Sequence, residues 1–357
     1  MYRALAINPG STSTKIAVFD DEQCVFEKTL RHSAGELNEF EGIIDQHEFR
    51  KNLVLDAMKE NNIEPETLHA VVGRGGLVKA ISGGTYVINK QMLEDLQNPE
   101  LWGRIHASNL GAFIANSIAK PLNIPSFIVD PVTVDEFDEI ARISGIPQIE
   151  RKSLFHALNI RYIARKVAEK IGKKFDDCNM IAVHMGGGIT IGAISKGRTI
   201  DVNNALLGMG PFSPQRAGAL PIGDLLDMAY SDKISKDELI TLLTRKGGLS
   251  AYLGTDDGVE IEQKIDNGDE KFTFIHEAMC YQICKEIGAC ATVLEGKVDV
   301  IFLTGGLARN PHTVKSIIKR VNFIAPIEIL AGEKEMEALS QGAIRVLKGL
   351  EPAKEYV

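Results

Sequence analysis

The sequence predicts an α/β protein with two related domains, and three observations support this prediction. Apolar runs at residues 4–7 and 16–19 flank a turn of small polar residues, and a similar arrangement returns around residue 186. Predicted strands alternate with predicted helices in both halves, which is the order that gives a sheet covered by helices. The length of 357 residues is enough for two or three domains.

The first turn, residues 8–15, reads Asn-Pro-Gly-Ser-Thr-Ser-Thr-Lys and joins two predicted buried strands in a tight hairpin. Gly10 permits close approach of the backbone, and the hydroxyls of Ser11 and Ser13 can donate hydrogen bonds. Successive N–H groups in such a turn form an anion-binding concavity, to which Lys15 adds a positive charge. We interpret the turn as a phosphate-binding element, although an ordinary polar hairpin fits this stretch equally well.

The second turn contains the glycines Gly186, Gly187 and Gly188 between apolar runs at residues 180–184 and 189–194. It repeats the order of buried strand, small-residue turn and buried strand. Internal similarity of this kind predicts two related domains, each of which offers a turn to one ligand.

A third glycine turn follows a predicted strand at residues 298–304. The strand ends in Gly305 and Gly306 and leads into a predicted helix, a geometry that is typical of nucleotide binding. The dipeptide alone is a weak signal, so it supports the other two turns rather than standing by itself.

The remaining elements of the first half follow from turn residues and helix breakers. Asn61 closes a predicted helix, glycines follow the strand at residues 68–72, and Pro131 ends the last strand directly after Asp130. The predicted strands are residues 4–7, 16–19, 24–32, 68–72, 85–88 and 126–129, and the predicted helices are residues 40–61 and 102–119.

The second half repeats this order, with an irregular insertion predicted at residues 247–258. The last helix follows the end of the second domain, so we expect it to pack back on the first. We therefore predict a first domain of residues 1–132 plus 337–357 and a second, nucleotide-binding domain of residues 133–336. The predicted strands here are residues 180–184, 189–195, 198–202, 298–304 and 327–330, and the helices are 153–171, one each around Leu225 and Leu239, 272–295, 311–321 and 335–349.

Composition and charge exclude several classes of protein. The chain is 44% hydrophobic and 25% charged, as in ordinary globular proteins. The net charge is −8 and no basic cluster is present, which argues against a nucleic-acid partner. No apolar run reaches the length of a membrane span and the N-terminus enters a strand directly, so we expect a cytoplasmic protein with no membrane partner. The five scattered cysteines do not form a disulfide framework, and Cys280 and Cys284 are better explained as buried thiols than as metal ligands.

These motifs resemble those of the acetate, propionate and butyrate kinase group, within the superfamily of actin, sugar kinases and heat-shock ATPases. The group's N-terminal signature matches Asn8 to Lys15, and its His before a glycine-rich turn matches His184 to Gly188. The resemblance covers essentially the whole chain. The motif sequences are most similar to those of the butyrate kinases. It implies two actin-like, ribonuclease H-like domains, each a mixed sheet flanked by helices, around a nucleotide cleft.

The resemblance also implies roles for single residues. Asp130 stands at a strand end where the group positions magnesium, and His156 matches a histidine that contacts the transferring phosphoryl group. Arg216, in Arg-Ala-Gly, matches a clamp for carboxylate and phosphoryl oxygens. Arg74 replaces the His of a His-Gly-Gly motif, while Val71 occupies the place of a family arginine, so Arg74 would have to reach the same space from a shifted position.

Several further positions complete this comparison. Glu335 resembles a late acidic residue tied to magnesium, and Gly305 with Gly306 resembles the turn beside the adenosine. Ile160 stands where acetate kinases commonly have a second histidine, and no acidic residue follows the Arg-Ala-Gly sequence, so neither role is assigned. His106 has a family counterpart, and we predict only that it lines the site.

The chemistry is consistent with these residue types. A carboxylate acceptor is already ionised at neutral pH, so its attack on a γ-phosphoryl group needs no general base. Phosphoryl transfer depends on positioning and charge stabilisation, for which arginine, lysine, histidine and Mg²⁺ are suited. The predicted catalytic residues are Asn8, Arg74, Asp130, His156 and Arg216; those that bind ATP or ADP are Gly10, Ser11, Ser13, Lys15, His184, Gly186, Gly187, Gly188, Gly305 and Gly306; the magnesium ligands are Asp130 and Glu335.

We expect reversible phosphoryl transfer from ATP to butanoate, with isobutyrate, propionate or acetate as alternative acceptors, in a homo-oligomer of two or more chains. Each residue alone has an ordinary explanation: Arg216 as a surface ion pair, His156 as a helix-start residue and Asp130 as a turn former. A sugar kinase of the same superfamily would use Asp130 as a base and would not need Arg216. A non-metabolic actin-like ATPase would need a peptide-binding appendage or polymer contacts.

Overall fold

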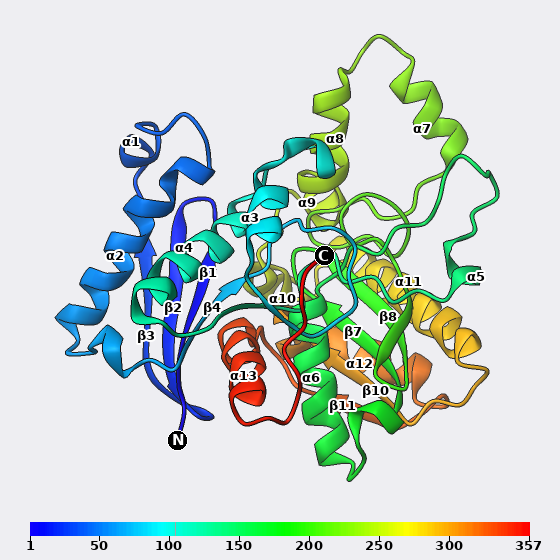
Figure 1. Ribbon diagram of the computed structural model, residues 1–357. Helices are drawn as coiled ribbons and strands as arrows, with labels where there is room; N and C mark the ends of the chain where they lie inside the picture. Colours follow the sequence, from blue (N-terminus) through cyan, green and yellow to red (C-terminus); the bar gives the residue numbers. More distant parts are fainter. Residues whose placement is uncertain (104) are drawn as a thin grey trace. The chain divides into compact units, whose positions relative to one another are not determined.

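The computed structural model describes residues 1–103 and 105–357, which form an α/β structure of two compact units (Figure 1). The first unit contains Met1–Val134, Ala157–Asn159 and Lys334–Val357, and the second contains Asp135–His156 and Ile160–Glu333. Each unit has one mixed β-sheet with helices packed on it, so the predicted fold class is confirmed. No helix in the described part of the chain is long and apolar enough to cross a membrane.

The first unit contains a six-stranded sheet that includes the predicted N-terminal hairpin. Its strands are β1 (Arg3–Pro9), β2 (Ser13–Asp20), β3 (Gln23–Arg31), β4 (Ala70–Arg74), β5 (Thr85–Val87) and β6 (Ser126–Val129), and its helices are α1 (Ala34–Leu37), α2 (His47–Glu60), α3 (Lys90–Gln97), α4 (Leu110–Ala119) and α13 (Glu335–Leu347). The strand order is β3-β2-β1-β4-β6-β5, in which β1, β4 and β6 run parallel.

The two faces of this sheet carry different side chains because neighbouring residues of a strand point in opposite directions. Leu5 and Ile7 belong to the core that includes α2 and α4. Ala4 and Ala6 are also fully buried, but they point to the other face. Helix α13 packs against β1, β4 and β6, and we attribute its close approach to these small side chains.

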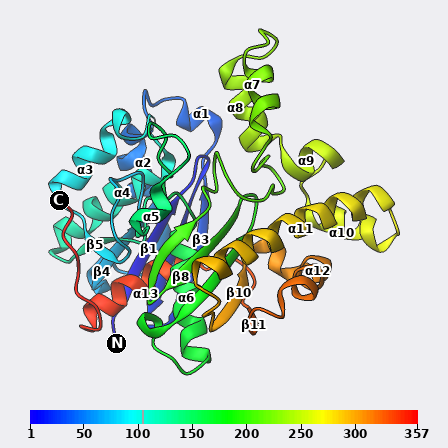
Figure 2. The ribbon, with the colours of Figure 1, turned by 90° about the vertical axis from the view of Figure 1, so that its right-hand side faces the viewer.

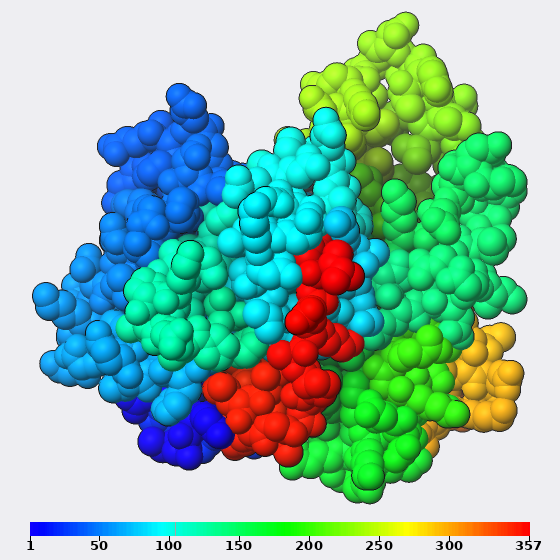
Figure 3. All heavy atoms as spheres, in the orientation of Figure 1, coloured from blue at the N-terminus to red at the C-terminus, as the bar shows by residue number. Residues whose placement is uncertain are grey.

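The C-terminal segment is anchored on the first unit by backbone and side-chain contacts. Lys354 pairs through its backbone with β5, and Tyr356 is buried, with its hydroxyl donating to Asp95 at 2.7 Å. In Figure 3 this segment lies in red on the cyan surface of residues in the same unit. The C-terminal segment is therefore part of the first unit, together with the N-terminal residues.

The second unit contains a five-stranded sheet with the order β11-β10-β7-β8-β9. Its strands are β7 (Asn179–Met185), β8 (Ile189–Ser195), β9 (Arg198–Val202), β10 (Val300–Thr304) and β11 (Ile327–Ile329), and its helices are α5 (Glu139–Arg142), α6 (Ala157–Lys170, of which the first three residues belong to the first unit), α7 (Ile222–Ala229), α8 (Lys236–Arg245), α9 (Gly248–Leu253), α10 (Gly258–Asp266), α11 (Glu270–Val293) and α12 (Pro311–Val321). β7, β8 and β9 form an antiparallel meander, whereas β10 and β11 run parallel to β7. Figure 2 shows α11 and α12 side by side against this sheet.

Three predicted helices are too long at their N-terminal ends. The helix predicted at residues 153–171 begins at Ala157. The helix predicted at residues 40–61 begins at His47, after a short 3₁₀ turn, Ile44–Gln46. The helix predicted at residues 102–119 begins at Leu110, because the chain first makes a 3₁₀ turn that is capped by His106. Residue 104 of that prediction lies outside the described residues.

The irregular insertion predicted at residues 247–258 is wrong, because residues 248–253 form α9 and α10 begins at Gly258. The residues that suggested a loop are helix ends. Gly254 has a φ of +79° and ends α9, and Asp257 accepts hydrogen bonds from the first N–H groups of α10. Glycine and aspartate are common at these two positions for the same reasons that they are common in loops.

The cysteines are consistent with the expected absence of a disulfide framework, since all five are free thiols. Burial raises the pKa of Cys280 to about 12 and that of Cys284 to about 11, so both thiols stay protonated at neutral pH. They pack as small apolar side chains in α11, as the sequence predicted.

Acid is expected to destabilise the second unit through His276 of α11. This buried ring makes a 2.8 Å hydrogen bond with Thr313 Oγ1, and burial lowers its pKa to about 4. An unfolded histidine takes up a proton below about pH 6.5, whereas the folded one resists until about pH 4, so stability falls as the pH drops through this window. The loss reaches about 3 kcal/mol at its acid end.

Urea unfolding at pH 7, 5.5 and 4.5 tests this expectation. Replacement of His276 by glutamine should flatten the loss of unfolding free energy between pH 6.5 and pH 4. His312→Gln is the matched control, because His312 is a partly exposed residue of α12 that pairs with Asp266. Equal pH slopes for wild type and His276→Gln would contradict the prediction.

Candidate active site

In the first unit, predicted site residues gather at the carboxyl edge of the parallel strands. Asn8 lies near the end of β1, Arg74 is the last residue of β4, and Asp130 directly follows β6. The strand register pairs Arg74 with Val129, so the ends of β4 and β6 are level. This edge is where ligands bind in open α/β sheets.

Glu335, the first residue of α13, connects two of these residues. Asn8 Nδ2 donates to Glu335 Oε2 at 2.7 Å, and Arg74 Nη1 lies 2.6 Å from Glu335 Oε1. Arg74 also donates to Asn8 Oδ1 at 3.3 Å. Three residues that the sequence predicted separately are therefore in direct contact, which places Arg74 within the predicted site of this unit.

Asp130 is a buried carboxylate in an unusual backbone conformation. Its φ is +38°, which aspartate tolerates better than most residues, and it is 3% exposed. Asp130 Oδ1 accepts a 2.7 Å hydrogen bond from the Gly84 N–H, and the Asp130 N–H donates to the Gly84 carbonyl at 3.0 Å. The carboxylate is thus held in one orientation at the sheet edge by the loop that precedes β5.

The N-terminal turn closes as the sequence predicted, but Lys15 lies differently. The Gly10 N–H donates to the Ser13 carbonyl at 2.7 Å and closes the hairpin. Lys15 Nζ forms a partly exposed ion pair with Glu27 on β3, at 2.9 Å. Sequence reasoning missed Arg50, whose guanidinium contacts the carbonyl groups of this turn, because no local pattern distinguishes it from other basic residues of a helix.

The second unit brings its predicted residues together at an equivalent edge. His184 of β7 pairs in register with Thr304 of β10, so the two glycine turns that follow these strands are neighbours. Gly305 has a φ of +85°, and a Cβ there would lie 2.4 Å from the Met185 carbonyl oxygen. Only glycine fits this position, which explains the first residue of the Gly305-Gly306 pair.

Two histidines stack at this edge. The rings of His156 and His184 lie 4.1 Å apart, with 19° between their planes. His156 shares a 2.7 Å hydrogen bond with Thr190 Oγ1 of β8, and its side chain makes no capping bond to α6. The explanation of His156 as an ordinary helix-start residue is therefore not favoured by the geometry.

Arg216 lies against the Gly186–Gly188 turn. A Cβ at Gly188 would be 2.2 Å from Arg216 Nη1, so the glycine makes room for the guanidinium. Ser213 Oγ donates to the Gly187 carbonyl at 2.6 Å and accepts from the Arg216 N–H at 3.1 Å. Arg216 Nη1 also donates to the Ala205 carbonyl. The glycine turn and the arginine thus form one connected structure.

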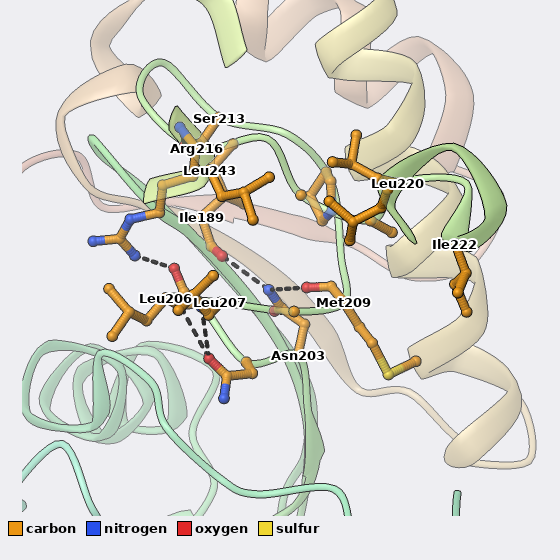
Figure 4. Close-up of a pocket in the computed structure, with 17 residues that line it drawn as sticks. Ile189, Asn203, Leu206, Leu207, Met209, Ser213, Arg216, Leu220, Ile222 and Leu243 are labelled. Atoms are coloured by element: carbon orange, nitrogen blue, oxygen red, sulfur yellow. Dashed lines mark hydrogen bonds between the residues drawn. The ribbon is translucent and has the colours of Figure 1, made fainter. Parts of the chain in front are cut away.

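A cavity of about 410 Å³ adjoins Arg216 in the same unit (Figure 4). The guanidinium stands at one side of it, and apolar side chains, among them Leu206, Leu207 and Leu220, form much of its wall. Such a combination of one charged group with apolar walls suits an anion that carries an apolar tail.

The donor set of the first unit fits a magnesium ion that arrives with a nucleotide. Mg²⁺ uses one or two carboxylates, keeps several waters and takes further oxygens from phosphates. Asp130 and Glu335 supply two carboxylates, and no group of three or more acidic, histidine or cysteine side chains that could hold a metal occurs within residues 1–103 and 105–357. Both carboxylates already have partners, since Glu335 is engaged by Arg74 and Asn8 and Asp130 accepts from the Gly84 N–H.

Comparison with known proteins gives consistent matches. Residues 147–340 match the Acetokinase family. The chain is 55% identical to Butyrate kinase 1 of Clostridium acetobutylicum over 356 residues, with 100% of both chains covered. The fold is shared with a crystal structure of Porphyromonas gingivalis acetate kinase (TM-score 0.80, 20% identity, 97% and 100% of the two chains). It is also shared with a propionate kinase from Francisella tularensis (TM-score 0.75, 19% identity, 96% and 99%).

Proposed function

The chain belongs to the acetokinase family, and from this premise we propose that it is a short-chain fatty acid kinase. The proposed reaction is the reversible transfer of the γ-phosphoryl group of ATP to butanoate, giving ADP and butanoyl phosphate. Its strongest support is the full-length relationship, at 55% identity, to a protein named Butyrate kinase 1.

One structural observation carries the choice of a carboxylate acceptor. Arg216 combines a guanidinium fork, held against the Gly186–Gly188 turn, with an adjoining apolar cavity. The fork can bind two oxygens of a carboxylate or phosphoryl group, while the cavity can hold a short hydrocarbon chain. A sugar acceptor would need hydroxyl-binding polar groups in place of these apolar walls.

The proposed mechanism is direct in-line transfer. A carboxylate oxygen of the acid attacks the γ-phosphorus, and the bond from that phosphorus to the β,γ-bridging oxygen breaks, so ADP leaves. No proton moves, because the acceptor is already ionised. Arg216 and His156 stabilise the charge on the transferring group, and Asn8 with Arg74 contributes hydrogen-bond donors from the first unit. The three glycine turns are assigned to ATP, and Lys15 would have to leave its ion pair with Glu27 to join them.

We assign the metal requirement to Mg²⁺, with Asp130 as the residue that holds its bound water and Glu335 as a further acidic group. When bound, the ion neutralises charge on the phosphates. The carboxylate of Asp130, fixed by Gly84, supplies an oriented acceptor for that purpose. We further propose a cytoplasmic location and assembly into a homo-oligomer.

The acyl-chain preference provides the test of this function. We expect kcat/KM to be highest for butanoate or isobutyrate, lower for propionate and valerate, and lowest for acetate. Each buried methylene contributes about 0.8 kcal/mol, so two of them give discrimination of about tenfold or somewhat more.

The assay uses ATP, Mg²⁺ and acids of two to six carbons, with hydroxylamine to trap the acyl phosphate. Glucose and glycerol serve as control acceptors that would reveal a sugar or polyol kinase. Their phosphorylation is measured by the release of ADP. If acetate equals or exceeds butanoate, the butanoate assignment is wrong and the carboxylate kinase assignment stands. Activity on the hydroxyl compounds without activity on any acid would overturn the whole proposal.

A further inference from the structure

Arg50 of α2 is a buried cation behind the N-terminal turn. The residue is 1% exposed, although arginine is almost never fully buried without a partner. All of its hydrogen bonds within the described chain are to neutral acceptors: the amide of Gln46, the hydroxyl of Thr14 and three backbone carbonyls of the turn. Its charge is therefore balanced by dipoles, and the turn supplies most of them.

The contacts hold one particular part of the turn. Arg50 Nη1 donates to the Gly10 carbonyl at 2.7 Å, and Nη2 donates to the Ser11 carbonyl at 3.1 Å. Gln46 Oε1 accepts from Nε at 3.2 Å and from Nη2 at 2.7 Å, which fixes the plane of the guanidinium. The side chain therefore grips two successive peptide groups with both terminal nitrogens.

This grip determines where the N–H groups of the turn point. In a planar trans peptide the carbonyl and the N–H point in opposite directions. Because the carbonyls of Gly10 and Ser11 point at Arg50, the N–H groups of Ser11 and Thr12 must point away from it. Ser11 and Thr12 are both exposed residues. We therefore infer that the two N–H groups face the accessible side of the turn. Two successive N–H groups of this kind form an anion-binding concavity.

We propose that Arg50 is a positioning residue that holds the Gly10–Ser13 turn in the conformation that binds the phosphate groups of ATP, and that its buried charge strengthens this binding. The proposal rests on the proposed function only in naming ATP as the anion.

Three facts support a contribution from the charge itself. Burial lowers the pKa of Arg50 to about 10, so the guanidinium remains charged at neutral pH. A buried charge is screened less than one in water, so it acts on an anion at the other side of the turn. The nearby Lys15 is paired with Glu27, which leaves Arg50 as the cation that faces the turn with neutral partners only.

The test compares the dissociation constants for ATP and adenosine by calorimetry in wild type, Arg50→Lys and Arg50→Met. Adenosine lacks phosphates, so its binding reports on the rest of the site. Arg50→Lys and Arg50→Met both lose the charged hydrogen bonds to the turn. We therefore expect them to bind ATP about 10- to 100-fold more weakly, with the affinity for adenosine nearly unchanged. Lys51→Met is the matched control, since Lys51 follows Arg50 in α2 but pairs with Glu48. It should bind both ligands like wild type.

Gln46→Glu separates the charge of Arg50 from its support of the fold. A carboxylate of the same shape keeps the hydrogen bonds to Arg50 and neutralises its charge, so this variant should unfold at no lower urea concentration than wild type. We nevertheless expect it to bind ATP several-fold more weakly, again with adenosine unchanged.

The outcomes distinguish this inference from the proposed function. An unchanged ratio of ATP to adenosine affinity in Arg50→Lys and Gln46→Glu overturns the inference even if the enzyme phosphorylates butanoate. Equal weakening of the binding of both ligands leaves this ratio unchanged and also overturns the inference, because that result indicates general structural damage. Wild-type protein that binds ATP but phosphorylates no acid would overturn the proposed function and leave the role of Arg50 supported by its own binding data.

Discussion

Replacement of Arg216 by alanine is expected to lower kcat by about two to three orders of magnitude, which is the usual cost of losing one preorganised donor at a developing charge. The affinity for ATP should change far less, because Arg216 is assigned to the acceptor and to the transferring group. Steady-state kinetics with butanoate and ATP, together with a separate measurement of ATP binding, give both quantities.

Arg216→Lys is the matched control for charge. Lysine keeps the positive charge but lacks the planar fork, so it should recover only a small part of the lost rate. The alanine variant should remain folded, since the guanidinium lies beside Gly188 and a cavity rather than in the core. Near-normal turnover in a folded Arg216→Ala protein would remove Arg216 from the mechanism.

Asp130→Asn is expected to abolish most activity in both reaction directions, by about a hundredfold or more, because it removes a charge that is assigned to magnesium-bound water. The fold should survive. Asparagine keeps an Oδ1 acceptor for the Gly84 N–H, and it tolerates the φ of +38° as well as aspartate does. Raised Mg²⁺ concentrations should restore a small part of the rate.

Asp21→Asn is the matched control for this substitution. Asp21 also has a positive φ, +51°, but it lies in the β2–β3 turn and pairs with Lys348. This variant should retain activity. If the activity of Asp130→Asn instead recovers as the pH is raised, hydroxide would be replacing a missing base, and Asp130 would then have the role that it has in a sugar kinase.

Much of the fold follows from local sequence patterns. Both hairpins were predicted with antiparallel pairing, because an apolar run on each side of a short turn leaves little other arrangement. The helix predicted at residues 311–321 has those bounds in the structure, since Asn310 caps it and Pro311 starts it. Local signals were misread where one residue type serves two purposes, as with Gly254 and Asp257 in the predicted insertion.

The candidate site was predicted as separate residues rather than as an arrangement. The motifs identified Asn8, Arg74 and Glu335, but nothing in the sequence indicates that the three side chains touch. Their contacts join residues that are 66 and 327 positions apart, and such pairs depend on which strands become neighbours and where α13 packs. The same applies to the stacked pair His156 and His184, which come from different elements.

The sequence by itself determined the fold class, the turns and the residue types of the proposed chemistry, because these depend on short-range periodicity and on motif order. Only the tertiary structure decided which charges face which groups. It pairs Lys15 with Glu27. It also places Arg50, a helix residue that no sequence motif identified, behind the Gly10–Ser13 turn. The physical reason is that a side chain's partners are set by the packing of distant segments, which no local pattern of residues encodes.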